Sequence, residues 1–413
     1  MSDPTPQAPA PAPERFDVVV IGGGPVGACA ATLLARDSSL RVCVIESNRP
    51  MPPAGPIDAR VVAVSRASER ILQAAGAWKR IAGPRVAPYE RMRIWHERTE
   101  PYSSHALVFD AAEAGESNLG YIAESRLLQS ALLDEFEACG GAIRTGGFRS
   151  LKIDVDWVTV ETDSGPLNAR LAIGADGAKS AVRQSVGLTA EISDYDETAI
   201  VATINTEKPH ESTAWQRFMR DGTLAFLPVA DGAVSIVWSA DTPLAQSLLA
   251  MPPADFEREL NRASAEVRGT TRLVSERYPF PLRRLGAHRY VAHRCALVGD
   301  AAHVVHPLAG QGVNLGFMDA AALAELIIQA SREKEDPGAM RILRRYERWR
   351  KSDVAIMSAA VTAFDRFLAH GSGPISRLAQ RGLGWVNGSP ELKRLFVGRA
   401  LGLSGELSAY ARP

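Results

Sequence analysis

Residues 16–46 constrain the fold of this chain more than any other segment. The run FDVVVIGGG starts as a short, wholly apolar and β-branched stretch, which is typical of a strand buried on both faces of a parallel sheet. A small-residue helix, PVGACAATLLARD, follows directly, and LRVCVIE reads as a second strand that ends at Glu46. The segment therefore predicts a βαβ unit and favours the α/β class.

The turn between the first strand and the helix has the pattern G-x-G-x-x-G, formed by Gly22, Gly24 and Gly27, with Pro25 opening the helix. The first glycine permits the tight turn, the second lets a pyrophosphate approach the backbone, and the third lets helix and strand pack closely. Glu46 ends the second strand, where a carboxylate accepts hydrogen bonds from ribose hydroxyls and repels a 2′-phosphate. The unit thus favours FAD or NAD over NADP, whereas a glycine turn without a ligand is the weaker reading.

The middle of the chain has a different pattern. From about residue 195 to 245, TAIVATINTE, GTLAFLPV and GAVSIVWSA alternate with Asp-Gly and Pro punctuation, which indicates an antiparallel sheet. The dinucleotide style returns at CALVGD, and helices are expected from about residue 312 onward. These shifts predict a disordered tail at 1–15, a discontinuous cofactor domain at 16–75, 121–190 and 290–350, a substrate sheet domain at 76–120 and 191–289, and a helical segment at 351–413.

Two further motifs follow apolar strands. In LAIGADGAKSAVR, the strand delivers Asp176 to a turn, where the carboxylate is either a ligand-binding group or a helix cap. In CALVGDAAHVVHPLAGQGVNLG, Asp300 can accept a hydrogen bond from a ribityl hydroxyl, and the loop that follows can aim backbone N–H groups at a ring from a helix N-terminus. His303 and His306 lack the carboxylate or cysteine partners that would complete a metal site, so no metal is expected.

Composition excludes several classes of function. Lys+Arg and Asp+Glu both number 47, so the net charge gives no reason to expect a nucleic-acid partner. The four cysteines are scattered, which favours buried thiols in a reducing compartment. The Pro/Ala-rich start lacks the features of a signal peptide, and no uncharged run has the length of a membrane span. We expect a cytoplasmic protein.

The three motifs together resemble those of the class A flavoprotein monooxygenases with the p-hydroxybenzoate hydroxylase fold. GGGPVG with Glu46, GADGAKSAVR and GDAAHVVHPLAGQGVNLG carry the resemblance, and GYIAESRLLQSAL, RFMRDGTLAFLPVADGAVSIVWS and RRYERWRKSD extend it over roughly residues 16 to 405. Within that class the chain is most similar to the ubiquinone-biosynthesis hydroxylases, and its middle segments to the branch that hydroxylates C5 of a polyprenylphenol. The implied fold is a Rossmann-type FAD domain with an inserted mixed or antiparallel sheet and a helical C-terminus.

The resemblance also implies roles for individual residues. It assigns FAD as cofactor, O2 as co-substrate, NAD(P)H or another electron donor, and ring hydroxylation through a flavin C4a-hydroperoxide. His306 is a candidate catalytic base by its position only, and a structural histidine that orients the Pro307 loop is the favoured reading. The residues implied in FAD binding are Gly22, Gly24, Pro25, Gly27, Glu46, Arg60, Arg126, Gln129, Asp176, Gly299, Asp300, Pro307, Gly310, Gly312, Val313 and Asn314.

The substrate wall and the partners are expected as follows. Phe226, Pro228 and Trp238 lie in apolar strands of the inserted sheet and are candidates for an aromatic wall facing the flavin, with ordinary core packing as the alternative. RILRRYERWRK has six basic residues and one acidic residue, and residues 371–413 have six and two. That composition suits peripheral contact with the inner face of a bacterial cytoplasmic membrane, where a prenylated phenol would reside.

Other readings stay open at this point. They are a helical cap packed on the core or on a second copy of the chain, contact with other ubiquinone-biosynthesis proteins, and a soluble hydroxylase of a small phenol. A prenyl-lipid reductase and a non-catalytic prenyl-binding escort protein would share the FAD motifs. A flavin-dependent halogenase would require a W-x-W-x-I-P motif that the sequence lacks.

Overall fold

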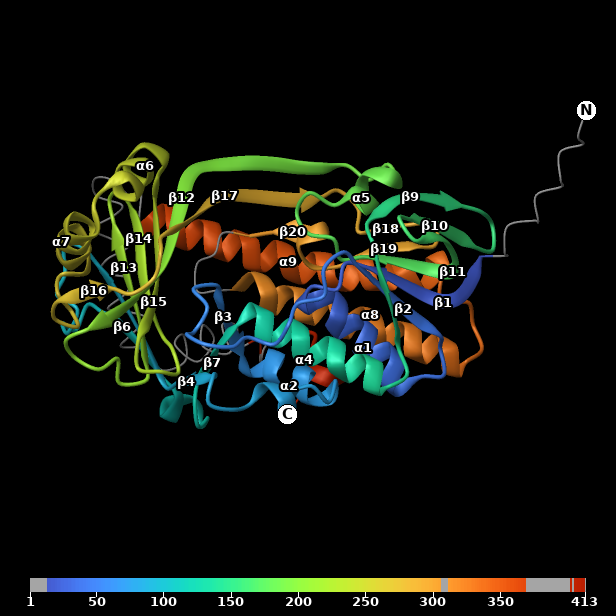
Figure 1. The fold of residues 1–413 in the computed structure, drawn as a ribbon, viewed down its shortest axis with the longest axis horizontal. Coiled ribbons are helices and arrows are strands. Elements are labelled where there is room, and N and C mark those ends of the chain that lie inside the picture. Colours follow the sequence, from blue (N-terminus) through green and yellow to red (C-terminus); the bar gives the residue numbers. More distant parts are fainter. Residues whose placement is uncertain (1–12, 306–310, 369–401, 403–404, 413) are drawn as a thin grey trace, which may run out of the picture.

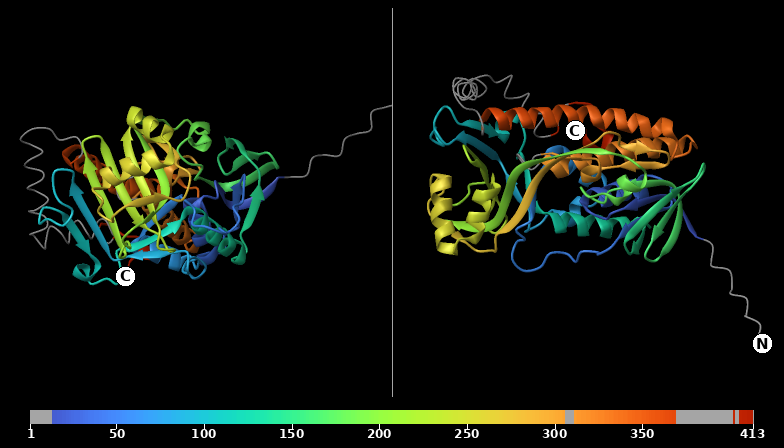
Figure 2. Two further views of the ribbon diagram at one scale, coloured as in Figure 1. Left: turned by 60° about the vertical axis from the view of Figure 1, so that its left-hand side comes forward. Right: turned by 90° about the horizontal axis from the view of Figure 1, so that it is seen from above.

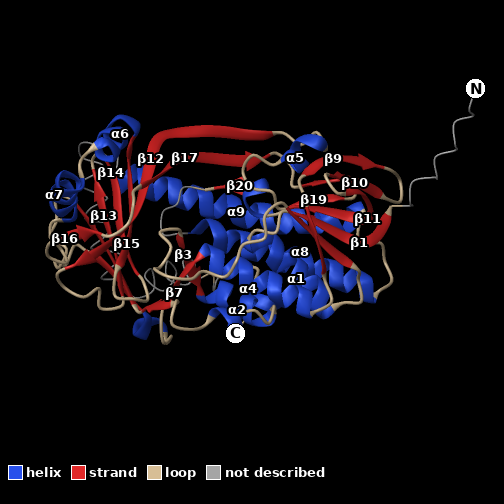
Figure 3. Ribbon diagram, viewed as in Figure 1, coloured by secondary structure: helices blue, strands red, loops and turns tan. Residues whose placement is uncertain are grey.

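The computed structural model describes residues 13–305, 311–368, 402 and 405–412. Two large sheets lie at opposite ends of an elongated molecule, and long helices fill the space between them (Figure 1; Figure 3, strands red and helices blue). The helices are α1 (Pro25–Asp37), α2 (Arg66–Ala74), α3 (Trp78–Ile81), α4 (Ser125–Ala138), α5 (Ala181–Ser185), α6 (Thr242–Ala250), α7 (Pro253–Ser264), α8 (Gln311–Arg332) and α9 (Met340–Leu368), with 3-10 turns at Ala111–Ala114, Gly299–Ala301 and Ala409–Ala411.

The first sheet is built on the βαβ unit expected from the sequence. Its strand order is β18-β19-β11-β1-β2-β8, and β9 and β10 continue it antiparallel from β11. The pairs β1–β2, β1–β11, β2–β8 and β11–β19 are parallel, which requires crossover connections such as α1. The strands are β1 (Glu14–Ile21), β2 (Val42–Glu46), β8 (Ala142–Thr145), β9 (Phe148–Ile153), β10 (Val158–Thr162), β11 (Gly165–Gly174), β18 (Val291–Ala292) and β19 (Cys295–Leu297).

The second sheet is antiparallel except where β13 pairs parallel with β5. Its strand order is β20-β17-β12-β15-β14-β13-β5-β6, with β16 beside β12. Two long strands, β12 and β17, pair along most of their length and form a ribbon toward the first sheet (Figure 1). The strands are β5 (Arg91–His96), β6 (Leu107–Asp110), β12 (Ala190–Thr206), β13 (Thr213–Met219), β14 (Gly222–Pro228), β15 (Val234–Asp241), β16 (Thr271–Leu273), β17 (Tyr278–Ala287) and β20 (His303–Val304).

A small third sheet lies between the large ones. It has the order β3-β7-β4, with β3 at Val61–Ser65, β7 at Gly120–Glu124 and β4 at Ala87–Tyr89. The region 76–120, which we expected to belong with the substrate sheet, is therefore divided. Its β4 pairs with β7 in the small sheet, while its β5 and β6 join the second large sheet.

Two separate hydrophobic cores support the two large sheets. The larger core contains β1, β2, α1, α4 and α8, where residues such as Val19, Leu33 and Phe136 are fully buried. The smaller core lies between the second sheet and the helices α6 and α7, and it contains Trp238 and Phe256, whose rings lie 5.9 Å apart. Each large sheet is thus stabilised by a core of its own.

Helix α8 belongs to the larger core. Among the described residues it is the one helix, at Gly312–Arg332, that is long and apolar enough to span a membrane, but 78% of its most apolar stretch is buried inside the fold. Helix α9 runs along one long side of the molecule (Figure 2, right). The membrane-contacting stretch expected beyond it, which includes Arg377 to Trp385 and Leu392 to Leu403, lies outside the described residues except for Gly402.

The last described residues, 405–412, pack back on the larger core. The hydroxyl of Tyr410 donates to Asp37 at 2.7 Å, and the indole N–H of Trp349 donates to the carbonyl of Glu406 at 2.8 Å. Ala411 is fully buried. The part of the 351–413 segment that follows residue 404 is therefore anchored to the cofactor half of the fold.

Candidate active site

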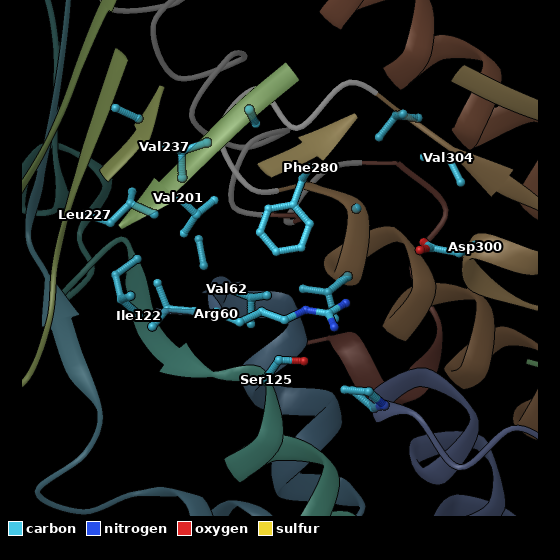
Figure 4. A pocket seen from close by; sticks show the side chains of 18 of the residues that line it. Arg60, Val62, Ile122, Ser125, Val201, Leu227, Val237, Phe280, Asp300 and Val304 are labelled. Carbon is cyan, nitrogen blue, oxygen red and sulfur yellow. The ribbon is translucent and has the colours of Figure 1, made fainter. Parts of the chain in front are cut away.

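A cavity of about 490 Å³ lies between the two large sheets. One wall comes from the glycine turn after β1 and the start of α8, and the other comes from β12 to β15 and β17 (Figure 4). The side chains of Arg60 and Phe280 extend into the space between Leu227 and Val237 on one side and Asp300 on the other. The cavity therefore joins the region expected to bind a dinucleotide to the region expected to bind substrate.

The glycine turn has the shape of a cradle. Gly22 has φ +100°, and a Cβ there would lie 2.4 Å from the carbonyl oxygen of Ala175. A Cβ on Gly27 would lie 2.0 Å from the carbonyl oxygen of Gly22, so the helix can pack on the turn only without one. A Cβ on Gly24 would meet nothing within 4 Å, and no side chain caps the N-terminus of α1. The open space at this helix start suits a pyrophosphate.

Glu46 stands at the end of β2, beside this turn. One carboxylate oxygen accepts from the N–H of Gly23 at 2.8 Å, and the other accepts from the N–H of Asn48 at 3.0 Å. The backbone therefore fixes the carboxylate in place at the position where a ribose would be bound.

Asp300 follows β19 and lines the cavity. Gly299, with φ +58°, turns the chain there. The Asp300 side chain is accessible to solvent but lies in the concave wall, where burial raises the pKa of its carboxyl group and the nearby His303 and Arg60 oppose that rise. Such a carboxylate, which has no close partner in the described part of the chain, is suited to accept hydrogen bonds from a ligand.

A buried ionic cluster supports the turn at Gly299 and Asp300. Asp319 on α8 accepts from the N–H of Gly299 at 3.0 Å, lies 2.5 Å from Nε2 of His303, and accepts from Nε of Arg350 at 2.7 Å. Burial favours the neutral acid, but His303 and Arg350 outweigh it and lower the pKa of Asp319. His303, considered above as a metal ligand, instead serves as a partner of Asp319.

The motif around Asp176 is used locally. One carboxylate oxygen accepts from the Ser180 hydroxyl at 2.5 Å and the other from the N–H of Val182 at 3.0 Å. Ser180 caps α5, and the guanidinium of Arg183 donates to the carbonyl of Ala301 at 2.7 Å. The structure shows the helix-capping contacts, and a role of Asp176 in FAD binding stays a prediction. The motif thereby braces the turn that carries Asp300.

The three residues Arg60, Arg126 and Gln129, all expected to bind FAD, are placed differently from one another. Arg60 lines the cavity, whereas Arg126 and Gln129 lie on α4 and do not belong to the cavity wall; Ser125 at the start of that helix does. Arg126 lies 3.9 Å from Asp58.

The loop that carries Arg60 is held by a buried carboxylate. Glu124 accepts from the N–H of Asp58 and from two nitrogens of Arg85, each at 2.7 Å. Arg85 also donates to the carbonyls of Gly55 and Pro56 at 2.8 and 3.1 Å. This Arg85–Glu124 clamp fixes residues 55–58 of the loop. Sequence reasoning missed it because its two residues lie 39 positions apart, with no spacing rule that relates them.

The start of α8 is only partly described. Gly312 and Val313 line the cavity, as expected, whereas His306, Pro307 and Gly310 lie outside the described residues. The side-chain amide of Asn314, which was expected to bind FAD, bonds to the backbone of β3 instead. It accepts from the N–H of Ser65 at 2.9 Å and donates to the carbonyl of Ala63 at 2.8 Å, and so ties α8 to β3.

The expected aromatic wall requires a correction. Phe226 and Trp238 are 3% and 4% exposed and pack in the smaller core, and Pro228 shares their side of the strand. Their neighbours Ala225, Leu227, Val237 and Ser239 line the cavity instead. Side chains alternate between the faces of a strand, and both faces of these strands are buried, so hydrophobicity alone could not say which set faced the cavity.

The cavity face of the second sheet holds three polar side chains that sequence reasoning missed. Gln216, Thr223 and Ser239 come from β13, β14 and β15 and all line the cavity. The available signal was weak: each is an uncharged polar residue within a largely buried strand, and β13 and β15 contain other polar residues that do not line the cavity.

Residues 15–359 match the family described as FAD binding domain. The chain belongs to this family. Its relatives include the ubiquinone hydroxylase UbiL of Rhodospirillum rubrum, which is 36% identical over 94% of this chain and 89% of the relative. The 3-demethoxyubiquinol 3-hydroxylase of Escherichia coli is 35% identical over 94% and 98%, and the COQ6 ubiquinone biosynthesis monooxygenase of Danio rerio is 30% identical over 93% and 89%.

Solved structures of two proteins named as monooxygenases have the same fold. p-Nitrophenol 4-monooxygenase PnpA of Pseudomonas putida superimposes with a TM-score of 0.75 at 20% identity, covering 95% of this chain and all of that one. PqsL of Pseudomonas aeruginosa gives 0.72 at 23%, covering 90% and 99%. The p-hydroxybenzoate hydroxylase-like fold expected from the sequence is confirmed.

Membership of the FAD binding domain family confirms the class of enzyme. The chain is an FAD-dependent aromatic-ring monooxygenase that uses FAD, O2 and NAD(P)H or another electron donor. The described residues fit the cofactor: Gly24 has open space above it, the N-terminus of α1 has no side-chain cap, and Asp300 faces the cavity.

Proposed function

We propose that this monooxygenase hydroxylates the aromatic ring of a polyprenylphenol in ubiquinone biosynthesis, at C5. Three relatives with 30% identity or more are named as a ubiquinone hydroxylase, a 3-demethoxyubiquinol 3-hydroxylase and a ubiquinone biosynthesis monooxygenase, and the middle segments resemble the C5 branch. The observation that carries the proposal is the cavity itself. Among its described lining residues the charged side chains are Arg60 and Asp300, both on the cofactor side, and the rest of the wall is largely apolar.

FAD binding is assigned to the walls near the first sheet. We propose that the turn Gly22, Gly24, Pro25 and Gly27 receives the pyrophosphate, Glu46 the ribose and Asp300 the ribityl chain, with Gly312 and Val313 beside the ring. In this proposal Asp176 and Asn314 act indirectly by shaping the turn and the start of α8. The cofactor domain is then formed by segments 16–75, 121–190 and 290–350, although β20 also pairs with the second sheet.

The protein's own contribution is to position the ring and keep water away. Bound FAD supplies the activation of O2 that ring hydroxylation requires. Val201, Leu227, Val237 and Phe280 present apolar surface to the ring and exclude water from it. None of the described lining residues is a histidine, and His306 lies outside the described residues, so its role as the base stays a prediction.

Membrane contact also stays a proposal. Arg344, Arg345, Arg348 and Lys351 are exposed along one side of α9, which would lie against anionic lipid at the inner face of the cytoplasmic membrane. A prenylated substrate would reside in the membrane, so the enzyme would have to meet it at the membrane surface. Contacts with other biosynthetic proteins or with a second copy belong to the same proposal.

Mass spectrometry of lipid extracts tests the function directly. Cells that lack the protein should accumulate an under-hydroxylated prenylphenol, and the wild type but not Asp300→Ala should restore the quinone. The mass and fragmentation of the intermediate identify the ring position. An unchanged quinone pool, in cells shown to have no second hydroxylase, would replace this proposal with a hydroxylase of a small phenol.

A further inference from the structure

Three neutral polar side chains interrupt the apolar wall of the cavity on the side of the second sheet. Thr223 on β14 and Ser239 on β15 lie directly opposite each other in the antiparallel register. Gln216 on β13 pairs with Ala225, two residues from Thr223, and so occupies the adjacent diagonal position on the same face. We refer to Gln216, Thr223 and Ser239 as the polar row.

The polar row is buried and has no protein partner for its side chains. Gln216, Thr223 and Ser239 are 5%, 7% and 2% exposed, and within the described part of the chain none of their side chains makes a hydrogen bond. Their polar atoms are not among the buried ones without a partner and open onto the cavity, so a ligand that displaces water there has to replace the hydrogen bonds of that water. Alanine and valine serve at nearby lining positions, Ala199 and Val201. Three such groups on one cavity wall therefore indicate a ligand that supplies the missing partners.

The charge of the row limits the chemistry of that ligand. All three groups are neutral, and the one cation in the described lining, Arg60, lies on β3's side of the cavity rather than in the second sheet. Hydroxyl and amide groups bind hydroxyl, methoxy or carbonyl oxygens well, whereas a carboxylate placed on this wall would lose its hydration without gaining a counter-charge.

We propose that the polar row binds the oxygen substituents of the aromatic ring and so determines which ring the enzyme accepts. The row would select an uncharged, oxygen-substituted phenol over an analogue in which the oxygen is replaced by carbon. The inference rests on the proposed function, because it assumes that the aromatic ring of the substrate occupies this cavity.

The same sheet provides a matched control. Thr203 on β12 and Ser235 on β15 are also directly opposite each other, 5% and 1% exposed, and their hydroxyls have no partner among the described residues, but neither residue lines the cavity. Replacing this pair removes the same atoms from the same sheet. The double variant Thr203→Val with Ser235→Ala thus reports any general effect on folding.

The test uses the FAD-loaded full-length enzyme and two probes of nearly equal shape, 2-methoxy-6-prenylphenol and 2-ethyl-6-prenylphenol. Their dissociation constants are measured from the change that each probe causes in the flavin absorbance spectrum. We expect the wild type to bind the methoxy probe with a dissociation constant about tenfold lower, a difference that about one to two hydrogen bonds would supply. Thr223→Val with Ser239→Ala should abolish most of that preference, and Gln216→Leu should reduce it.

The conservative exchange Thr223→Ser with Ser239→Thr keeps both hydroxyls and should keep the preference, as should the Thr203/Ser235 control. The inference is overturned if the cavity double variant retains the wild-type preference, or if the control pair loses it equally. If the wild type binds neither probe, the proposed function fails and the inference falls with it. Binding of the probes without an effect of the polar row refutes the inference alone.

Discussion

The two later glycines of the turn can be separated experimentally, because the structure gives them different reasons for lacking a side chain. A methyl group on Gly24 meets nothing within 4 Å and φ there is −59°, so Gly24→Ala should change the stability of the apoprotein by less than about 0.5 kcal/mol. The same methyl occupies the space assigned to the pyrophosphate. We expect FAD affinity to fall by about 30- to 100-fold, which is about 2 to 3 kcal/mol.

Gly27→Ala should behave in the opposite way. Its Cβ would lie 2.0 Å from the carbonyl oxygen of Gly22 and 2.8 Å from the side chain of Ala175, so α1 has to move away from the turn. Overpacking of this kind costs about 1 to 3 kcal/mol or more. The apoprotein itself should therefore be destabilised, whether or not FAD is present.

Urea unfolding of the apoprotein and fluorescence titration with FAD measure the two effects independently. The reasoning predicts that Gly24→Ala loses affinity with an unchanged urea midpoint, and that Gly27→Ala lowers the midpoint. Wild-type FAD affinity in Gly24→Ala would refute the placement of the pyrophosphate. An equal loss of apoprotein stability in both variants would refute the distinction between them.

Three further predictions concern the carboxylates around the cavity. Burial raises the pKa of Asp300, so the folded protein loses stability as the pH rises from the ordinary carboxyl pKa through that raised value. Asp300→Asn should therefore stabilise the apoprotein at neutral pH but weaken FAD binding. Thermal unfolding with and without FAD measures both effects, and a change in the opposite direction would contradict the corresponding expectation. Because His303 and Arg350 lower the pKa of Asp319, the stability that this carboxylate gives the fold should be lost only as the pH falls below the ordinary carboxyl range. Asp319→Asn should lower the free energy of unfolding in urea by about 3–5 kcal/mol at pH 7, and a loss below about 1 kcal/mol would contradict the ionic cluster. Glu124→Gln weakens the hold on Arg85 and the Asp58 loop, so trypsin should cleave after Arg60 faster than in the wild type, while an unchanged cleavage rate would show that the clamp does not restrain the loop.

Motifs that depend on the backbone were predictable from the sequence. The β1–α1–β2 unit, the glycine turn, Glu46 at the strand end and Asp300 after β19 all lie where their spacing indicates, since strand periodicity and glycine conformation are local properties. The class of sheet in the middle of the chain was equally readable, because its turns carry Asp-Gly and Pro signals.

Side-chain direction was not predictable in the same way. Phe226 and Trp238 were assigned to the cavity, but strands buried on both faces give no hydrophobic signal to distinguish one face from the other. Asp176 and Asn314 lie in recognisable motifs, yet their polar atoms bind the protein itself. The Arg85–Glu124 clamp joins segments 39 residues apart and has no sequence signature.

The separation of the two hydrophobic cores has a consequence for how such enzymes diversify. Trp238 and Phe256 stabilise the second sheet from behind, while β1, α1 and α8 stabilise the cofactor turn in a core of their own. Substitutions at distant, unconnected sites have nearly additive effects on stability. The cavity-facing residues of β13, β14 and β15 can therefore drift through gene duplication toward new rings, while the inherited cofactor half keeps its stability and its chemistry.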